Sequence, residues 1–335
     1  MKEFRKVNKT FIKSDNSTTK IFNRYLYCLI PFLLLIVLYN LIWGDSVVII
    51  NLLRNIFVSI ISCLVVGYIF NLIKKEKSFS KLNFKDNVLT IAIIIGLFSK
   101  GVSLIVLIIA SIVSVIIRNM FKTKTISASL YGILIILISL YFSNDLDTPL
   151  LNLKNLSYIG TYDNIVKSYG SVLSYSLGLK YYLSPILSIV SFIYLFYKKS
   201  IKYNIVFSYI LTFSFMMLVV GLFNGMNIWY LFFQLCTGNI LFLTVFSLAD
   251  YPSTPITSEG QVIYGIILGF LTGILRFIVP ELAVVIVLIL GPILFVKNIN
   301  RISVRLKQNK KFKYMVLCIN ILLVVISSIV ISVII

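Results

Sequence analysis

A short polar segment near residue 250 carries side chains that could bind a ligand or an ion. It reads Asp250-Tyr-Pro-Ser-Thr-Pro-Ile-Thr-Ser-Glu-Gly-Gln and contains neither Lys nor Arg. Asp250 stands at the edge of an apolar stretch, where a carboxylate can contact a cation. Two prolines favour an irregular, extended backbone around Thr254. The alternative is a simple helix start, with Thr257 or Ser258 as the N-cap and Gly260 following.

A second polar segment, residues 143–170, separates two apolar stretches. It carries three aspartates, two lysines, Pro149 and Gly160. Thr148 offers a hydroxyl group within this segment. A long ordered loop is more often functional than a short one. The alternative is that Asp147-Thr148-Pro149 forms an ordinary turn.

The elements that must position these residues follow from composition. The chain has 335 residues, of which 59% are hydrophobic and only 13% charged, whereas a soluble domain carries about 25% charged residues. A membrane span needs roughly 20 apolar residues, and the apolar stretches here have no polar face. We therefore predict an all-α, polytopic transmembrane helix bundle of ten to eleven spans.

The expected spans are separated by short polar segments. They cover residues 25–43, 47–73, 88–99, 102–117, 126–142, 182–197, 205–223, 228–248, 262–278 and 282–296, with an eleventh at 315–335. The third span is short and is expected to be a partial or broken helix. Division of the ten helices into two inverted five-helix repeats is open, because the halves show no convincing residue-level similarity.

Charge sets the expected orientation. Most of the 31 Lys and Arg residues fall in the segments that would be cytoplasmic if the amino terminus is inside, as the positive-inside rule requires. We expect a basic cytoplasmic tail at 1–24, a ten-helix domain at 25–297, a basic linker at 298–314 and an extra C-terminal span at 315–335. The localisation predicted is the inner or plasma membrane, with the loop at 143–170 outside.

Several functional classes are disfavoured by composition. A net charge of +20 would indicate nucleic-acid binding in a soluble protein, but here the charges lie between apolar spans, so no nucleic acid is expected. The sequence has no histidine, and its four cysteines lie within apolar stretches without CxxC spacing. Imidazole-based metal sites and a disulfide framework are therefore not expected.

Residues 229–281 resemble the RnfD-type membrane subunit of the Rnf ferredoxin:NAD oxidoreductase, which is similar to the NqrB-type subunit of the sodium-translocating NADH:quinone reductase. The residues that carry the resemblance are Asp250, Tyr251, Thr254, Pro255, Thr257, Gly260, Gly265, Gly269, Leu275-Arg276 and Glu281. Asp86-Asn-Val-Leu-Thr90 and Gly170-Ser171 with Ser174 match more weakly. The Asn-Pro-Ala motif of that family is missing near residues 126–129, and the eleventh span is additional to its pattern.

The resemblance implies that FMN is attached to Thr148 through a phosphoester. The family carries Ser-Gly-Ala-Thr-Pro-Leu at this loop, and Thr148-Pro149-Leu150 is retained here without the preceding Ser-Gly-Ala. A phosphodiester needs cationic or N–H partners, and Lys154 and Arg276 are the candidates in the expected topology. Snorkelling of Arg276 to lipid headgroups is the alternative. Asp250, Thr254 and Thr257 are the candidate contacts on the cytoplasmic side.

The function implied is that of a flavin-carrying membrane subunit in an Rnf-like complex that couples electron transfer to Na⁺ or H⁺ movement. The implied partners are the other membrane and peripheral subunits and a flavin transferase, and a second, non-covalent flavin belongs to the same expectation. A nucleotide-binding fingerprint is absent, so NADH and ferredoxin must bind elsewhere. A non-redox transporter or permease is the leading alternative, and a membrane glycan polymerase is another.

Overall fold

The computed structural model describes residues 18–43, 46–73, 88–99, 101–120, 126–143, 184–223, 225, 228–236, 239–248, 254–279, 282–308 and 325. Within these ranges all regular structure is helical. The helical elements are α1 (Thr18–Trp43), α2 (Ser46–Ile73), α3 (Val88–Leu97), α4 (Leu104–Met120), the 3₁₀ turn η2 (Ile126–Ala128), α5 (Ser129–Phe142), α8 (Pro185–Tyr197), α9 (Tyr203–Phe223), α10 (Trp229–Cys236), α11 (Ile240–Leu243), the π-helical turn η4 (Thr244–Leu248), α12 (Ser258–Ile278), α13 (Ala283–Leu294) and α14 (Val296–Gln308).

The apolar helices form a polytopic bundle, as predicted, but few of them are long. Three segments can cross a membrane by length and composition: Ile50–Phe70, Tyr203–Phe223 and Ser258–Ile278. Two bent pairs raise the number to five, with bends of 54° between α10 and α11–η4 and 55° between α13 and α14. Four further apolar helices have 10–17 residues. Helix length in the described residues thus supports an all-α membrane bundle and falls short of ten full-length spans.

The third helix is short, as the sequence indicated. α3 has 10 residues, so it extends about 15 Å, half the thickness of a bilayer core. Nine of those residues are buried, which places α3 inside the bundle instead of against lipid.

The segment at 228–248, predicted as one span, is broken into α10, α11 and η4. Helix α14 continues to Gln308, into the segment predicted to be a linker.

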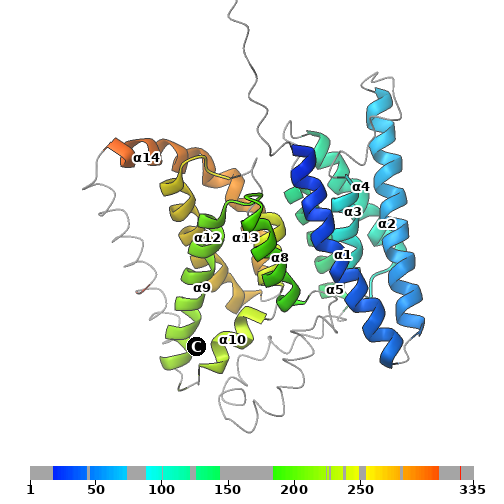
Figure 1. Ribbon diagram of the computed structural model, residues 1–335, viewed down its shortest axis with the longest axis horizontal. Coiled ribbons are helices and arrows are strands. Elements are labelled where there is room, and N and C mark those ends of the chain that lie inside the picture. Colours follow the sequence, from blue (N-terminus) through cyan, green and yellow to red (C-terminus); the bar gives the residue numbers. More distant parts are fainter. Residues whose placement is uncertain are drawn as a thin grey trace, which may run out of the picture.

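The helices fall into two groups with related order (Figure 1). α1 to α5 form one group and α8 to α13 the other, and each group has a short or broken third element. In Figure 1 α1 and α8 run in opposite directions, and so do α2 and α9. In the first group α2 packs on α4, and in the second α9 packs on α12. This arrangement is the one expected of two inverted five-helix repeats.

An aromatic cluster joins the two groups. Phe32 of α1 packs edge-on against Phe242 of α11, with ring centroids 5.3 Å apart, and Phe98 approaches the same ring at 6.0 Å. Phe246 of η4 stacks on Phe242 at 4.6 Å and meets Tyr25 of α1 at 5.9 Å. Such aromatic pairs contribute about 0.5–1.5 kcal/mol each beyond burial. The short third elements are therefore held at the contact between the groups.

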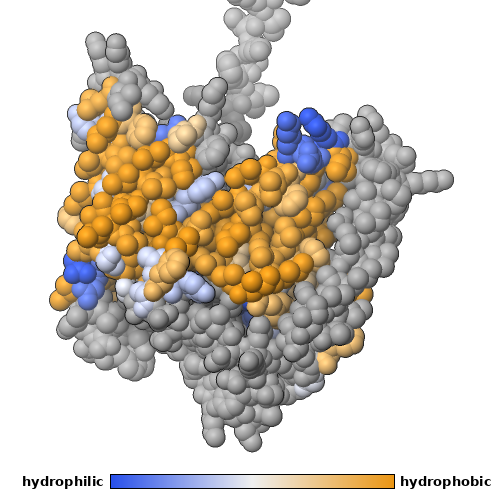
Figure 2. Space-filling view, turned by 180° about the vertical axis from the view of Figure 1, so that it is seen from behind, coloured by the Kyte–Doolittle hydropathy of each residue, from blue (hydrophilic) through white to orange (hydrophobic). Residues whose placement is uncertain are grey.

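Large apolar side chains cover the outside of the bundle. Leu211, Phe57 and Ile105 are 70%, 65% and 72% exposed, and Figure 2 shows a continuous apolar surface over one face of the molecule. Exposed apolar area on this scale is unstable in water and stable in lipid. The chain is a multi-pass membrane protein.

One end of the bundle gathers the segments that the charge pattern assigns to one side of the membrane. Arg24 donates to the carbonyl oxygen of Lys198 and to Oγ of Ser200, both at 2.8 Å. The backbone N–H of Ile256 donates to Oδ1 of Asn300 in α14 at 3.2 Å. These contacts unite α1, the α8–α9 turn, the segment before α12 and α14. We name this the basic end.

Candidate functional site

The segment before α12 is held by a lysine from another turn. Nζ of Lys202 donates to Oγ1 of Thr254 at 2.8 Å, to the carbonyl oxygen of Pro255 at 3.1 Å and to that of Thr254 at 3.3 Å. Thr254 is 5% exposed. The segment lacks a cation of its own in sequence, and Lys202, which precedes α9, supplies one. The hydroxyl oxygen of Thr254 and the carbonyl oxygens of Thr254 and Pro255 are thereby fixed as acceptors for the ammonium group of Lys202.

Thr257 begins α12 as its N-cap. Its backbone is extended, with φ −84° and ψ 148°, and Oγ1 accepts from the backbone N–H of Gly260 at 3.1 Å. This confirms the helix-start interpretation for the residue. Gln261, one residue after Gly260, donates through Nε2 to the carbonyl oxygen of Pro255 at 3.3 Å, and its Oε1 accepts from Nδ2 of Asn204. The segment before α12 is therefore bound to the start of α9 through Lys202 at Thr254 and through Asn204 at Gln261.

Arg276 lies near the other end of α12 and is buried. Nε donates to Oε1 of Gln234 at 2.7 Å, and Nη2 donates to the carbonyl oxygen of the same residue at 3.2 Å. The guanidinium carbon lies 5.9 Å from the ring centroid of Phe213, within the range of a cation–π contact. With only 3% of its surface exposed, Arg276 is paired inside the protein. Snorkelling to lipid is excluded for this side chain.

Arg118 occupies the corresponding place in the first group of helices. It stands two residues before the end of α4, as Arg276 does in α12, and it is 4% exposed. Four residues earlier, Ser114 donates to the carbonyl oxygen of Ala110 and Thr272 donates to that of Leu268, both at 2.8 Å. The two helices thus share a Ser/Thr-x-x-x-Arg pattern near their ends, although Arg118 donates to Asn119 of its own helix and Arg276 to Gln234 of α10.

The predicted site residues divide into three places. Thr254 and Thr257 lie at the basic end. Arg276 is 19 residues beyond Thr257 along α12 and so about 28 Å away. Thr148, Lys154 and Asp250 lie outside the described residues. The structure therefore brings Thr254 and Thr257 together and keeps Arg276 apart from them.

Two residues of these sites were missed by reasoning from sequence. Lys202 was counted only as one of many basic residues, although a polar segment without a cation was a signal that a neighbouring turn would supply one. Gln234 is the one amide within the apolar run of α10. A lone polar residue in such a run needs a partner, which is the signal that could have joined it to Arg276.

Thiol and metal chemistry find no support in the described part of the chain. Cys28 and Cys63 are buried and Cys236 is partly buried, all as free thiols. Among the described residues no group of three His, Cys, Asp or Glu side chains could hold a metal ion. The burial of Cys28 and Cys63 agrees with the interpretation of these two cysteines as small core residues.

Comparison with known proteins identifies the family. A family model described as the NQR2, RnfD, RnfE family matches residues 6–305. None of the curated proteins compared with the chain matches it. The matched range covers both helix groups and the segment from Asp250 to Arg276 on which the resemblance was based. The chain therefore belongs to the NQR2, RnfD, RnfE family and is a membrane subunit of an ion-translocating complex.

Proposed function

We propose that this chain carries FMN, attached through a phosphoester to Oγ1 of Thr148, and passes electrons within a complex that moves Na⁺ or H⁺. The observation that supports the proposal is the Thr148-Pro149-Leu150 run, retained inside the range that matches the family. It lies between α5 and α8, which is where the family carries its flavin-bearing threonine. When bound, FMN would supply one- and two-electron redox chemistry.

The charge distribution supports an outer location for this loop. Lys198, Lys297 and Arg301 are exposed at the basic end, and the positive-inside rule favours a cytoplasmic side for such an end. In Figure 1 α5 and α10 approach the opposite end. We infer that the basic end faces the cytoplasm and that the segment between α5 and α8 faces outward.

The described residues limit where a flavin phosphate could be bound. Nε and Nη2 of Arg276 already contact Gln234, so this arrangement does not fit a direct bidentate grip on phosphate. The guanidinium instead contributes positive charge near the outward end. Thr254 and Thr257 are likewise engaged by Lys202 and Gly260. The proposal therefore rests on Thr148 as the attachment point and Lys154 as the nearby cation.

The test is flavin fluorescence on the denatured protein. The chain is produced with a flavin transferase and its complex partners, separated on a denaturing gel and illuminated. Thr161, another threonine of the same loop, provides the matched control. We expect fluorescence for the unmodified chain and for Thr161→Val, and none for Thr148→Val.

A non-redox transporter is the second candidate. The absence of Ser-Gly-Ala before Thr148 favours it, because a flavin transferase recognises those small residues. A dark band for the unmodified chain, together with an active transferase on a control substrate, would reject covalent FMN. Purified complex without any bound flavin would then support the transporter.

A further inference from the structure

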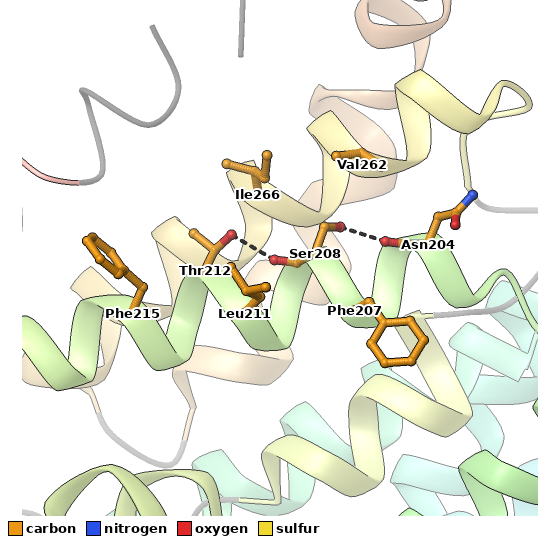
Figure 3. A pocket seen from close by; sticks show the side chains of 8 residues that line it. All are labelled: Asn204, Phe207, Ser208, Leu211, Thr212, Phe215, Val262 and Ile266. Carbon is orange, nitrogen blue, oxygen red and sulfur yellow. Dashed lines mark hydrogen bonds between the residues drawn. The ribbon is translucent and has the colours of Figure 1, made fainter. Parts of the chain in front are cut away.

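A groove runs along the outer surface between α9 and α12. It has a volume of about 490 Å³ and is lined by Asn204, Phe207, Ser208, Leu211, Thr212, Phe215, Val262 and Ile266. Figure 3 shows Phe207, Leu211 and Phe215 along α9 with Val262 and Ile266 across from them on α12. The side chains of Phe207 and Leu211 are 55% and 70% exposed. The groove is therefore open on the membrane side of the bundle.

Hydroxyl groups in the groove already have partners. Ser208 donates to the carbonyl oxygen of Asn204 at 2.7 Å, and Thr212 donates to that of Ser208 at 2.7 Å, as the dashed lines in Figure 3 mark. Nδ2 of Asn204 donates to Gln261. Small hydroxyl-bearing residues with satisfied donors leave a shallow surface on which another helix can pack closely. The groove thus favours an apolar helix over a polar ligand.

The chain itself contains an apolar helix-length segment beyond the family match. That match ends at residue 305, and α14 ends at Gln308. A basic tether of six residues, 309–314, precedes the apolar residues 315–335. Fully extended, six residues reach about 20 Å. The apolar segment has 21 residues, enough to cross a bilayer core.

Helix α14 delivers this segment to the correct side of the bundle. Gly260 at the start of α12 faces Ile299 and Ser303 of α14; a Cβ added there would lie 3.3 and 3.2 Å from their side chains. Figure 1 shows α14 crossing the basic end toward the side formed by α9 and α12, and the helix ends at Gln308. A helix that follows α14 and crosses the membrane from the basic end runs in the direction of α9, and α9 and α12 form the side of the bundle nearest to its start.

We propose that residues 315–335 form a helix that fills the groove between α9 and α12. Covalent tethering raises its effective concentration at this surface above that of a free partner or lipid. Counting from the basic end, Cys318 is three residues into the segment and Phe207 is four residues into α9. One turn deeper, Leu322 lies level with Leu211. Asn320 falls at the depth of Ser208, in the polar part of the groove.

Disulfide cross-linking of the full chain in membranes tests this placement. Cys28, Cys63 and Cys236 are replaced by alanine, Cys318 is kept, and a protease site is inserted in the tether at 309–313. In the Phe207→Cys variant we expect a disulfide with Cys318 to form, so that the C-terminal fragment stays attached to the chain after protease cleavage. In a second variant Cys318 is also replaced by alanine, and Leu211→Cys is combined with Leu322→Cys. We expect this pair to form a disulfide and to retain the fragment as well.

Matched controls lie at the same depths on α2, across the bundle. Ile69 and Val65 are 47% and 52% exposed, and the pairs Ile69→Cys with Cys318 and Val65→Cys with Leu322→Cys are expected to release the fragment. Release from the α9 pairs as well would overturn the proposal. Cross-links that form only between two chains would assign the groove to a second copy and also overturn it.

Quenching by brominated lipid gives a measurement that does not require cross-link geometry. A fluorescent label on Leu211→Cys is expected to be quenched less than one on Val65→Cys in the full chain. Termination of the chain after Gln308 is expected to raise quenching at position 211 to the level seen at position 65. Quenching at position 65 is expected to be the same in the full and the shortened chain. Equal quenching in the full chain would show that lipid fills the groove and would reject the proposal.

Discussion

Gln234 binds Arg276 with two acceptors at once, its side-chain Oε1 and its own backbone carbonyl oxygen. The two N–H donors of the guanidinium, Nε at 2.7 Å and Nη2 at 3.2 Å, fit this pair of oxygens as they would fit a carboxylate. A neutral residue thus orients a cation in a membrane-embedded position. It also ties α10 to α12 just before the bend that separates α10 from α11.

The first prediction concerns this pair. Gln234→Leu removes Oε1 and leaves a buried cation short of a strong acceptor, which costs about 1–3 kcal/mol or more for a charged group. We expect a clear fall in the thermal unfolding midpoint of the purified protein in detergent, with loss of the folded size-exclusion peak on mild heating.

Two variants separate the hydrogen bond from mere packing. Gln234→Glu keeps the acceptor and makes the bond charge-assisted, so its midpoint should equal or exceed that of the unmodified protein. Arg276→Lys keeps the charge but has no planar fork, and its midpoint should fall. Equal midpoints for Gln234→Leu and the unmodified chain would show that the pair contributes nothing to stability.

Sequence was sufficient for the helices because their signal is local. An apolar run without a polar face predicts a membrane helix whatever it packs against, and α2, α9 and α12 appear where the runs lie. The bend within 228–248 was missed because the segment was treated as a single apolar run. Thr237-Gly238-Asn239 interrupts that run, and Asn239 has a positive φ of 58°, a conformation in which Asn is more frequent than most residues.

The polar contacts were harder to predict because they join residues far apart in the chain. Lys202 and Thr254 are 52 residues apart, and Gln234 and Arg276 are 42 apart. Neither pair can be found from spacing, since the partner is chosen by helix packing. Thr257 was predictable because an N-cap is set by its immediate neighbours. The matching positions of Arg118 and Arg276 could be recognised only from the structure, which shows that each helix ends two residues after its arginine.

The second prediction concerns the contact between α9 and α12. A Cβ added at Gly269 would lie 2.6 Å from the carbonyl oxygen of Tyr209 and 3.1 Å from Cβ of Thr212. Backbone cannot move aside as a side-chain tip can, so Gly269→Ala must separate the two helices, at a cost of about 1–3 kcal/mol. We expect a lower unfolding midpoint in detergent and a faster rate of cleavage by added protease.

Gly67 supplies the matched control, because a Cβ there would meet nothing within 4 Å. Gly67→Ala is also a glycine-to-alanine change within an apolar helix, and alanine has the higher helix propensity. Its midpoint should stay level or rise. If Gly67→Ala and Gly269→Ala changed stability equally, close approach of α9 and α12 would not be the reason for glycine at position 269.

The third prediction joins the basic end to transport and depends on the proposed function. Asp250 stands four residues before Thr254 in the sequence, and Lys202 and Gln261 fix Thr254 and Pro255. In the proposed function the carboxylate of Asp250 attracts the cation that enters from the cytoplasm. We expect Asp250→Ala to lower Na⁺ or H⁺ uptake per electron transferred in vesicles, while flavin fluorescence on the chain stays unchanged.

The control for Asp250 is a carboxyl group at the basic end of the bundle. Glu259→Gln changes a carboxylate in the first turn of α12 and should leave uptake intact, because that side chain is half-buried and already accepts from Oγ of Ser258 at 3.0 Å. Unchanged uptake in Asp250→Ala would remove Asp250 from the ion path, since an essential entry carboxylate cannot be replaced by a methyl group without slowing the ion.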